Sequence, residues 1–410
     1  MLLSDLFKSD GPKPKEDPQA SPRPERSSRY GSVSLAGERV TVESSLSLAT
    51  AYRAKNIISD DVAKMPFQQI RKSGRNIDQV QPDAKLYNMA YLLQVSPNQW
   101  GWTPFQFKKA TIEWLLFYGN NYIWRPAVWP PQLLILPANK TVPVFDVEGN
   151  LWYKHTFANQ REPSYIPAVE VLQLLINPDQ SGFLGRGVIT FAREVFGEQL
   201  AAHKTRGSFF KQGLNPAAYI QVNATLDKAG RQLYRDAYTE AIGGANNAYK
   251  LAVFDNKITK FEPVTMTPKD AEFLQSIEAN DVDIANFFGM PLHMLNRGKE
   301  SYNSNEQKYI EYLQTTLDSY LVAWEEAARI RWLSQDEQAD TYFKFNRSAL
   351  LRMSNRERAE TNEVKIRSGQ MTPNEAREKD DSSAYDQGDE FYMTSNYAPI
   401  KKGSKPDDQP

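Results

Sequence analysis

The sequence predicts an α+β protein made of several parts, because two long helical patterns lie apart from runs of short, strand-like segments. One helix is expected over Thr267–Gly289, with a hydroxyl N-cap, proline at the first helical position and a terminal glycine. A second, longer apolar stripe covers Ser304–Leu333. Between Asn121 and Asn177, aromatic residues, prolines and turn residues indicate short strands. Helices and strands in separate stretches are typical of the α+β class.

Composition limits the kind of protein this chain can be. Its 410 residues are 40% hydrophobic and 12% aromatic, enough for a core and for two or three domains. The 49 lysines and arginines nearly balance 50 aspartates and glutamates. A protein that grips nucleic acid along its length is usually basic, because neutralising phosphates supplies its binding energy. Any contact with DNA or RNA is therefore expected to be local or weak.

Several site types are excluded by the rare residues. There is no cysteine, hence no disulfide framework, thiolate zinc site or cysteine nucleophile. The three histidines, at positions 155, 203 and 293, do not have metal-ligand spacing. We expect no metal and no cofactor. No apolar run approaches membrane-spanning length and the first residues lack a signal-peptide layout, so a soluble protein is expected.

The order of the predicted elements can be followed along the chain. Residues 1–42 and 381–410 are rich in proline and polar residues and are expected to be disordered. A mixed unit over 214–264 is predicted between two long helices, as an excursion out along one and back along the other. The expected helices are 51–62, 102–119, 188–212, 227–242, 267–288, 304–333, 357–368 and a short one from Thr372. The expected strands outside 121–177 are a hairpin from Phe67, 217–222, 251–254, 258–261 and 341–345.

Patterns of enzymes are present only in fragments. No GxxxxGK[ST] loop occurs, and the glycine-rich turn 182–187 is better explained as a loop-to-helix junction than as an anion site. Ser208 and Lys211 match SxxK, and Ser301-Tyr302-Asn303 and Lys72-Ser73-Gly74 resemble the other boxes of serine acyl-transferases. The boxes stand in the wrong order along the chain. A serine hydrolase is therefore the least favoured of three hypotheses.

Acidic and amide residues gather on one face of the helix that ends at Gly289. At 100° per residue, Glu278, Asp281 and Asp283 scatter around the helix and do not converge on a metal ion. A different set shares the face opposite the apolar one: Glu272, Gln275, Ala279, Asp283 and Asn286. Such a face is commonly no more than a solvated surface. The more specific hypothesis is a wall that repels a polyanion and keeps it mobile.

The loop between the two long helices carries positive charge. Arg297 and Lys299 flank Gly298, next to Asn296. Basic residues of surface loops often have no special role. The position of these residues between two helices makes them candidates for transient contact with phosphate groups.

Several short motifs occur in an order that is specific when they are taken together. They are Val62-Ala63-Lys64-Met65-Pro66, Ser96-Pro97-Asn98, Tyr118-Gly119-Asn120-Asn121-Tyr122, Ala192-Arg193-Glu194, Asp270-Ala271-Glu272-Phe273-Leu274, Ala285 to Leu295, Tyr302 to Gln307, Phe345-Asn346 and Met371 to Arg377. On these motifs the chain resembles the portal proteins of tailed bacteriophages, of the HK97-like family, over residues 46 to 380. It has Gly187-Val188 where family members often have Ser-Pro.

The resemblance implies a portal fold, with a mixed α/β wing, a two-helix stem, a small α/β clip, a long wing helix and a C-terminal helical crown. The implied parts are wing 43–187 and 305–350, stem 188–213 and 265–288, clip 214–264, tunnel loop 289–304 and crown 351–380. By the same resemblance Glu272, Gln275, Ala279, Asp283 and Asn286 would line a channel. Asn296, Arg297 and Lys299 would contact DNA from the tunnel loop.

The implied function is a homo-oligomeric ring, typically of twelve subunits, at one vertex of a capsid. Terminase would package double-stranded DNA through the ring, and the DNA would leave through it on infection. The implied partners are the terminase large subunit, the major capsid protein and head-completion or tail adaptor proteins. The implied location is the virion, after assembly in the host cytoplasm. No catalytic chemistry is implied.

Geometry is compatible with this function. Twelve helices packed about 10 Å apart form a ring about 38 Å across between helix axes, which leaves an opening of about 28 Å. A DNA duplex roughly 20 Å wide would pass through it with a film of water. The second hypothesis is a non-viral oligomeric scaffold or adaptor through which no nucleic acid passes.

Overall fold

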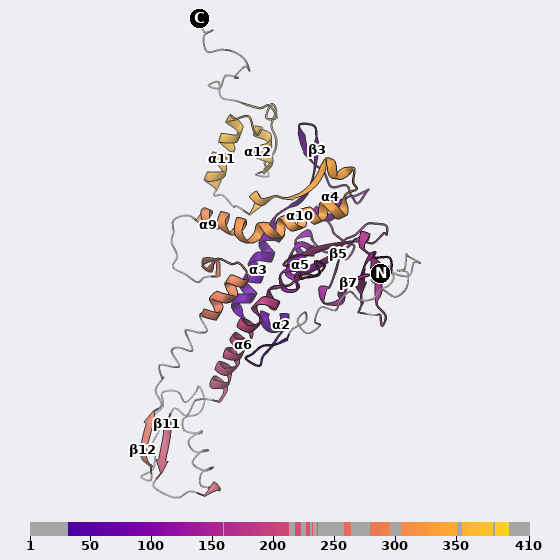
Figure 1. Ribbon diagram of the computed structural model, residues 1–410. Coiled ribbons are helices and arrows are strands. Elements are labelled where there is room, and N and C mark those ends of the chain that lie inside the picture. The colour runs from indigo at the N-terminus through magenta and orange to yellow at the C-terminus, as the bar shows by residue number, and fades with distance from the viewer. Residues whose placement is uncertain are drawn as a thin grey trace, which may run out of the picture. The chain divides into compact units, whose positions relative to one another are not determined.

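The computed structural model divides the chain into two compact units, Met1–Arg347 and Ser348–Pro410 (Figure 1). It describes residues 32–158, 160–212, 218–222, 258–263, 279–295, 305–350, 355–379 and 382–392, with a few positions between 227 and 236. Within these ranges, no helix is both long and apolar enough to cross a membrane.

Helices supply most of the regular structure. The α-helices are α2 (Val42–Leu46), α3 (Ala49–Lys64), α4 (Met89–Gln94), α5 (Pro104–Tyr118), α6 (Val188–Gln212), α9 (Asn305–Tyr312), α10 (Asp318–Trp332), α11 (Asn355–Arg367) and α12 (Pro373–Lys379). A further helical stretch covers residues 279–287. A π-helical turn, Leu313–Leu317, joins α9 to α10. Single 3-10 turns lie at Ala138–Lys140, Ala168–Glu170, Leu292–Leu295, Glu337–Ala339 and Arg347–Ala349.

The strands form small sheets in which every described pair is antiparallel. Two sheets have two strands each: β1 (Ser32–Val33) with β2 (Arg39–Val40), and β11 (Ala218–Val222) with β12 (Ile258–Pro263). Three sheets have three strands each, in the orders β13 (Thr341–Phe345)–β3 (Phe67–Ser73)–β4 (Asn76–Gln79), β10 (Val171–Leu175)–β5 (Asn120–Trp124)–β6 (Leu134–Leu136), and β7 (Thr141–Phe145)–β8 (Leu151–His155)–β9 (Ser164–Pro167). The predicted α+β class is therefore confirmed.

Most helix boundaries follow from local sequence. Thr103 caps α5 through a capping box with Gln106, proline follows at the first helical position, and Gly119 ends the helix in a left-handed conformation. Helix α3 ends at Lys64 because Pro66 disfavours a helical Met65, whose backbone is extended. The short helix α4 is an addition to the predicted elements, and Asn88 caps it.

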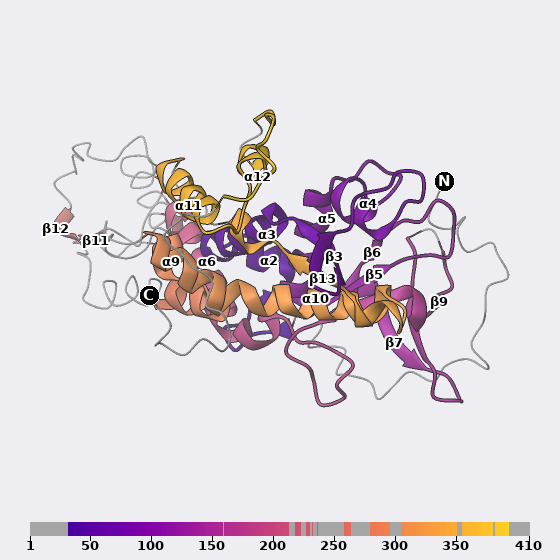
Figure 2. The ribbon, with the colours of Figure 1, turned by 90° about the horizontal axis from the view of Figure 1, so that it is seen from above.

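An aromatic cluster joins α10 to the sheet that contains β3. The rings of Phe67 and Phe345 stack with centroids 4.1 Å apart, and Trp324 lies 5.5 Å from each of them. All three side chains are at least 98% buried. Figure 2 shows α10, in orange, running beside β13 and β3. Helix α10 also packs on β10, so it ties two sheets together.

The turn before α6 is built on close backbone approach, as predicted for a junction. Added Cβ atoms on Gly185 and Gly187 would overlap the carbonyl groups of Gly119 and Phe117. The side chain of Asn120 completes the contact, because its amide oxygen accepts from Gly185 N (2.9 Å) and its amide nitrogen donates to Gly185 O (3.0 Å). A side chain at Gly187 would therefore require this turn to move.

Ordered structure begins earlier than predicted. The expectation of a disordered arm over 1–42 is wrong for residues 32–42, because β1 and β2 form a hairpin alongside α6. Leu35 N donates to Glu194 Oε2 (2.7 Å), and the missing side chain of Gly197 leaves room for Ser34. These are long-range contacts, so the polar composition of the segment does not reveal them.

The second unit holds α11 and α12. The predicted capping box at the start of α12 is confirmed by hydrogen bonds between Thr372 and Glu375 in both directions. The expectation that the chain is disordered from residue 381 is wrong for part of the tail. Asn374 binds the backbone of Tyr385 and Gly388 and the carboxylate of Asp389 (2.9 Å), which folds residues 385–389 onto α12.

Some predicted elements lie outside the described residues. They are most of the helix expected over 227–242, the strand over 251–254, and the beginning of the helix expected from Thr267.

The close approach at Gly119 predicts a large effect of Gly119→Ala. The Cβ would overlap backbone atoms of Gly185 and Arg186, and the residue has a φ of +71°. We expect the free energy of unfolding to fall by about 4 kcal/mol or more, measured by urea titration. Gly101→Ala is the matched control, because Gly101 has a similar φ of +76° and open space around it. It should cost only about 1–2 kcal/mol. Equal losses in the two variants would contradict the packing argument.

Buried Lys108 predicts a pH dependence of stability. The residue is 5% exposed, its ammonium donates to Met65 O, and burial lowers its pKa to about 8. Between pH 8 and the unfolded-state value of 10.5, the unfolded chain binds more protons, so this group makes stability rise with pH by up to about 3 kcal/mol. In Lys108→Met that rise should be absent, as measured by urea unfolding at pH 7.5 and 10. Lys85→Met, which changes an exposed lysine, is the surface control, and an unchanged pH response in Lys108→Met would contradict the expectation.

Candidate functional site

The helix over residues 279–287 separates an exposed polar face from a buried one. Ala279, Asp283 and Asn286 are exposed, and Phe287, at the edge of the same face, is 41% exposed. On the other face Ile284 and Phe288 are at most 2% exposed, and Phe288 contacts the ring of Phe117 in α5 edge-on, at 5.9 Å between centroids. The apolar face thus attaches this helix to the body and leaves the polar face free.

Asp281 is the exception on the buried face. It is 7% exposed, and its Oδ1 accepts hydrogen bonds from Thr50 Oγ1 of α3 (2.6 Å) and Gln199 Nε2 of α6 (3.4 Å). A buried carboxylate is tolerated only when donors satisfy it. These hydrogen bonds therefore fix the lateral positions of α3, α6 and helix 279–287 against one another.

The C-terminal end of helix 279–287 has a Schellman motif. Gly289, at φ +64°, donates to Asn286 O (2.9 Å), and Met290 N donates to Ala285 O (2.9 Å). The free carbonyl of Gly289 then accepts from the hydroxyl of Thr316, in the π-helical turn between α9 and α10. Turns of this type interrupt helices frequently at functional sites. Here the π turn fixes the C-terminal end of helix 279–287 against the junction between α9 and α10.

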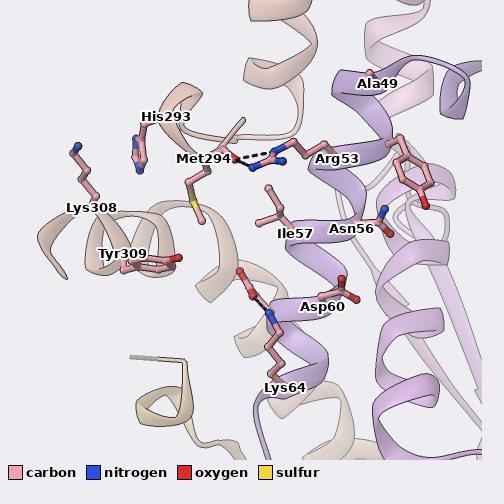
Figure 3. Close-up of a pocket in the computed structure, with 12 residues that line it drawn as sticks. Ala49, Arg53, Asn56, Ile57, Asp60, Lys64, His293, Met294, Lys308 and Tyr309 are labelled. Atoms are coloured by element: carbon pink, nitrogen blue, oxygen red, sulfur yellow. Dashed lines mark hydrogen bonds and ion pairs between the residues drawn. The ribbon is translucent and has the colours of Figure 1, made fainter. Parts of the chain in front are cut away.

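A second anchor holds the segment that follows. The guanidinium of Arg53 in α3 donates through Nε (3.0 Å) and Nη2 (2.9 Å) to the carbonyl of Met294, in the 3-10 turn Leu292–Leu295 (Figure 3). Both Gly289 and Met294 are thus tied by their carbonyl groups. Leu295 is the last described residue of this range, so the hydrogen bonds to Met294 fix the position at which the range ends.

An open groove of about 840 Å³ lies beside this anchor. Figure 3 shows side chains of α3 on one side and His293, Met294, Lys308 and Tyr309 on the other. Charged groups of α3 are already paired: Lys64 binds Asp61 (2.8 Å) and Lys109 binds Asp60 (2.5 Å). Burial raises the pKa of Asp61, against the lowering effect of Lys64. The two carboxylates that line the groove, Asp60 and Asp61, are therefore already paired.

The site residues predicted from the sequence divide into two groups. Ala279, Asp283 and Asn286 lie together on the exposed face. Glu272, Gln275, Asn296, Arg297 and Lys299 lie outside the described residues, and their roles stay predictions.

Some of the residues weighed for catalysis or metal binding lie on described elements. No group of three His, Asp or Glu side chains within the described ranges could hold a metal ion. Asp281 and Asp283 lie on opposite sides of the helix surface, one buried and one exposed. For the hydrolase hypothesis, Lys72 and Ser73 end strand β3 at a hairpin turn, and Ser208 and Lys211 belong to α6. What the geometry does provide is a polar helical face held rigidly from behind.

The anchoring residues were not predicted, and only one of them left a sequence signal. Asp281 stands in the apolar series of Ile277, Ile284 and Phe288, where a hydrophobic residue is expected. A charged residue in such a series predicts a buried polar contact. Arg53 and Thr316 act on backbone carbonyl groups of distant segments, which no sequence pattern indicates.

Comparisons with known proteins agree on one family. The sequence profile of the phage portal proteins matches residues 49–381. The portal protein of Enterobacteria phage HK97 is 27% identical over 391 residues, which cover 92% of this chain and 89% of that protein. The probable portal protein of Streptomyces phage phiC31 is 23% identical over 379 residues, covering 87% and 79%.

Solved structures show the same fold. A crystal structure of an HK97 family phage portal protein from Corynebacterium diphtheriae aligns with a TM-score of 0.53 and 18% identity, over 77% of this chain and 98% of that one. A chain from the neck of a native gene transfer agent particle, computed with C12 symmetry, aligns with a TM-score of 0.56 and 16% identity, over 84% and 92%. The predicted resemblance is confirmed: the chain belongs to the phage portal protein family, among its HK97-like members.

Proposed function

We propose that this chain is one subunit of a closed ring, with twelve copies around a channel that passes double-stranded DNA at one vertex of a capsid. The observation that carries the proposal is the family match over residues 49–381. The likeness to chains of gene transfer agent necks computed with C12 and C6 symmetry supports a ring whose number of copies is a multiple of six. Twelve helices at ordinary packing distance leave an opening of about 28 Å, wide enough for a duplex.

The ring would act in the virion, after assembly in the host cytoplasm. Terminase would drive DNA through it into the head, and head-completion or tail adaptor proteins would bind afterwards. The major capsid protein would surround it. The chain itself would perform no catalysis, in keeping with a polar site that positions and does not react.

Some of the described contacts support the division into parts that the family implies. Helix α6 and the helix ending at 287 would form the stem, because Asp281 joins them to each other and to α3. The segment between them, including the β11–β12 pair, would form the clip. Residues 43–187 and 305–350 would form the wing, 289–304 the tunnel loop and 351–380 the crown.

The exposed face of helix 279–287 would line the channel. Asp283 and Asn286, continued by Glu272 and Gln275, would present carboxylate and amide groups to passing phosphates. Like charges repel and amides bind phosphate weakly, so DNA would slide without being held. Arg297 and Lys299, with Asn296, would make brief phosphate contacts from the tunnel loop.

Charge reversal at Glu272 and Asp283 tests the lumen assignment. Two lysines per subunit would convert a repelling wall into an attracting one, at about 1 kcal/mol for each close ion pair in water. We expect rings to assemble and the rate of DNA packaging to fall roughly fivefold or more. Packaging in extracts with purified heads and terminase measures this rate.

A control variant separates channel charge from surface charge. Glu326→Lys reverses an exposed carboxylate on α10, away from the proposed lumen. It should package at the wild-type rate. If the Glu272 and Asp283 reversals also package normally, the face does not line the channel.

The ring itself can be tested without DNA. Electron micrographs of negatively stained protein should show closed rings with a central hole. A protein that stays monomeric at high concentration and with its assembly partners present would overturn the proposal. Filled discs or open chains would favour the scaffold hypothesis instead.

A further inference from the structure

Phe287 stands at one edge of the exposed polar face of helix 279–287. It is 41% exposed, whereas its neighbour Phe288 is 2% exposed and packs into the body. A single exposed phenylalanine is common on protein surfaces and by itself indicates no partner. What distinguishes Phe287 is its position beside the face that is assigned to the channel, where a closed ring brings the next subunit.

The opposite edge of the same face is small and apolar. Val282 is half-buried there, and Gly289, about two helical turns further on, is exposed and has no side chain. A Cβ added to Gly289 would come no closer than 3.7 Å to any neighbouring atom. One edge of the face thus carries a large aromatic side chain, and the other has room for one.

The angle between the two edges fits a ring of helices. Val282 and Phe287 are five residues apart, so at about 100° per residue their side chains point about 140° apart around the helix axis. Ala279, Asp283 and Asn286 lie within this arc. In a closed ring of twelve helices, the directions from one helix to its two neighbours are about 150° apart on the channel side, and in a ring of six about 120°. The two edges are therefore directed at the neighbours of a twelve-membered ring.

The packing distance is also suitable. Helices about 10 Å apart interdigitate their facing side chains. Equivalent residues of a cyclic ring lie at the same height along its axis. Long side chains of a helix lean toward its N-terminus, so the ring of Phe287 lies below its own Cα, between the levels of Val282 and Gly289 in the next copy.

We propose that Phe287 of each subunit packs against Val282 and Gly289 of the next subunit, and that this contact closes the channel wall. The partner is a second copy of this chain, and each copy uses both edges, as a head-to-tail ring requires. The inference rests on the proposed function, because it takes the face between the two edges as the channel side.

The buried contacts of Asp281 acquire a second role in this arrangement. Hydrogen bonds from Thr50 and Gln199 fix the rotation of helix 279–287 against α3 and α6. The same rotation sets the direction of both edges, so the anchor behind the helix also aligns the contact between subunits.

Charge substitutions at the two edges test the pairing in the full-length protein without DNA. Phe287→Glu and Val282→Lys each place an unpaired charge in an apolar contact. Each should raise the subunit concentration at half-assembly roughly tenfold or more, measured by analytical ultracentrifugation. The double variant places the two charges opposite each other in every interface, and it should return to within about threefold of the wild type. The two side chains cannot pair within one subunit, because they point about 140° apart.

Phe105→Glu is the matched control. Phe105 is 40% exposed and lies on α5 about 18 Å along the helix from Phe117, the residue that contacts Phe288. This variant should assemble at the wild-type concentration. Because Phe287 is exposed, Phe287→Glu should keep the far-ultraviolet circular dichroism spectrum of the wild type.

The outcomes separate this inference from the proposed function. Rings that form at the wild-type concentration in Phe287→Glu overturn the inference alone, because the ring then closes through other surfaces. Assembly that is lost in both single variants and not regained in the double variant also overturns it, since Phe287 would then face another part of the neighbour. A wild type that forms no rings overturns the proposed function together with the inference.

Discussion

Asp281 places a carboxyl group where the chain otherwise buries apolar side chains, and three helices are arranged around it. Thr50 of α3 and Gln199 of α6 donate to its carboxylate, which leaves the helix over 279–287 no freedom to slide or rotate against the body. An apolar residue in this position would bury well but would allow several registers. A buried carboxylate is satisfied in only one, so the contact gives specificity of position more than stability.

Two further side chains also fix the position of this part of the chain. The Thr316 hydroxyl and the Arg53 guanidinium bind the carbonyl groups of Gly289 and Met294, at the two ends of the segment that follows the helix. All three anchors join distant parts of the sequence, and all three lie behind the exposed polar face and not on it. In the proposed channel, the exposed face needs no anchoring groups of its own, because the contacts that position it come from α3, α6 and the π turn.

Sequence patterns predicted many elements well because their causes are local. The capping box at Thr103, the glycine stop at Gly119 and the proline after α3 act within one helical turn, and the corresponding boundaries agree with the structure. The hairpin over 32–40 and the folded part of the tail were missed for the opposite reason. Their order comes from Glu194, Gly197 and Asn374, which reach across the chain to segments whose composition is typical of disorder.

By itself the sequence determined the α+β class, the family and the separation of an acidic-amide face from an apolar one, since helical periodicity and ordered motifs are visible without coordinates. Only the tertiary structure decided that Asp281 is buried while Asp283 is exposed, and that a π turn receives the end of the helix. The physical reason is that burial and hydrogen bonding of a polar group depend on which distant segments surround it, and periodicity along one helix carries no information about those neighbours.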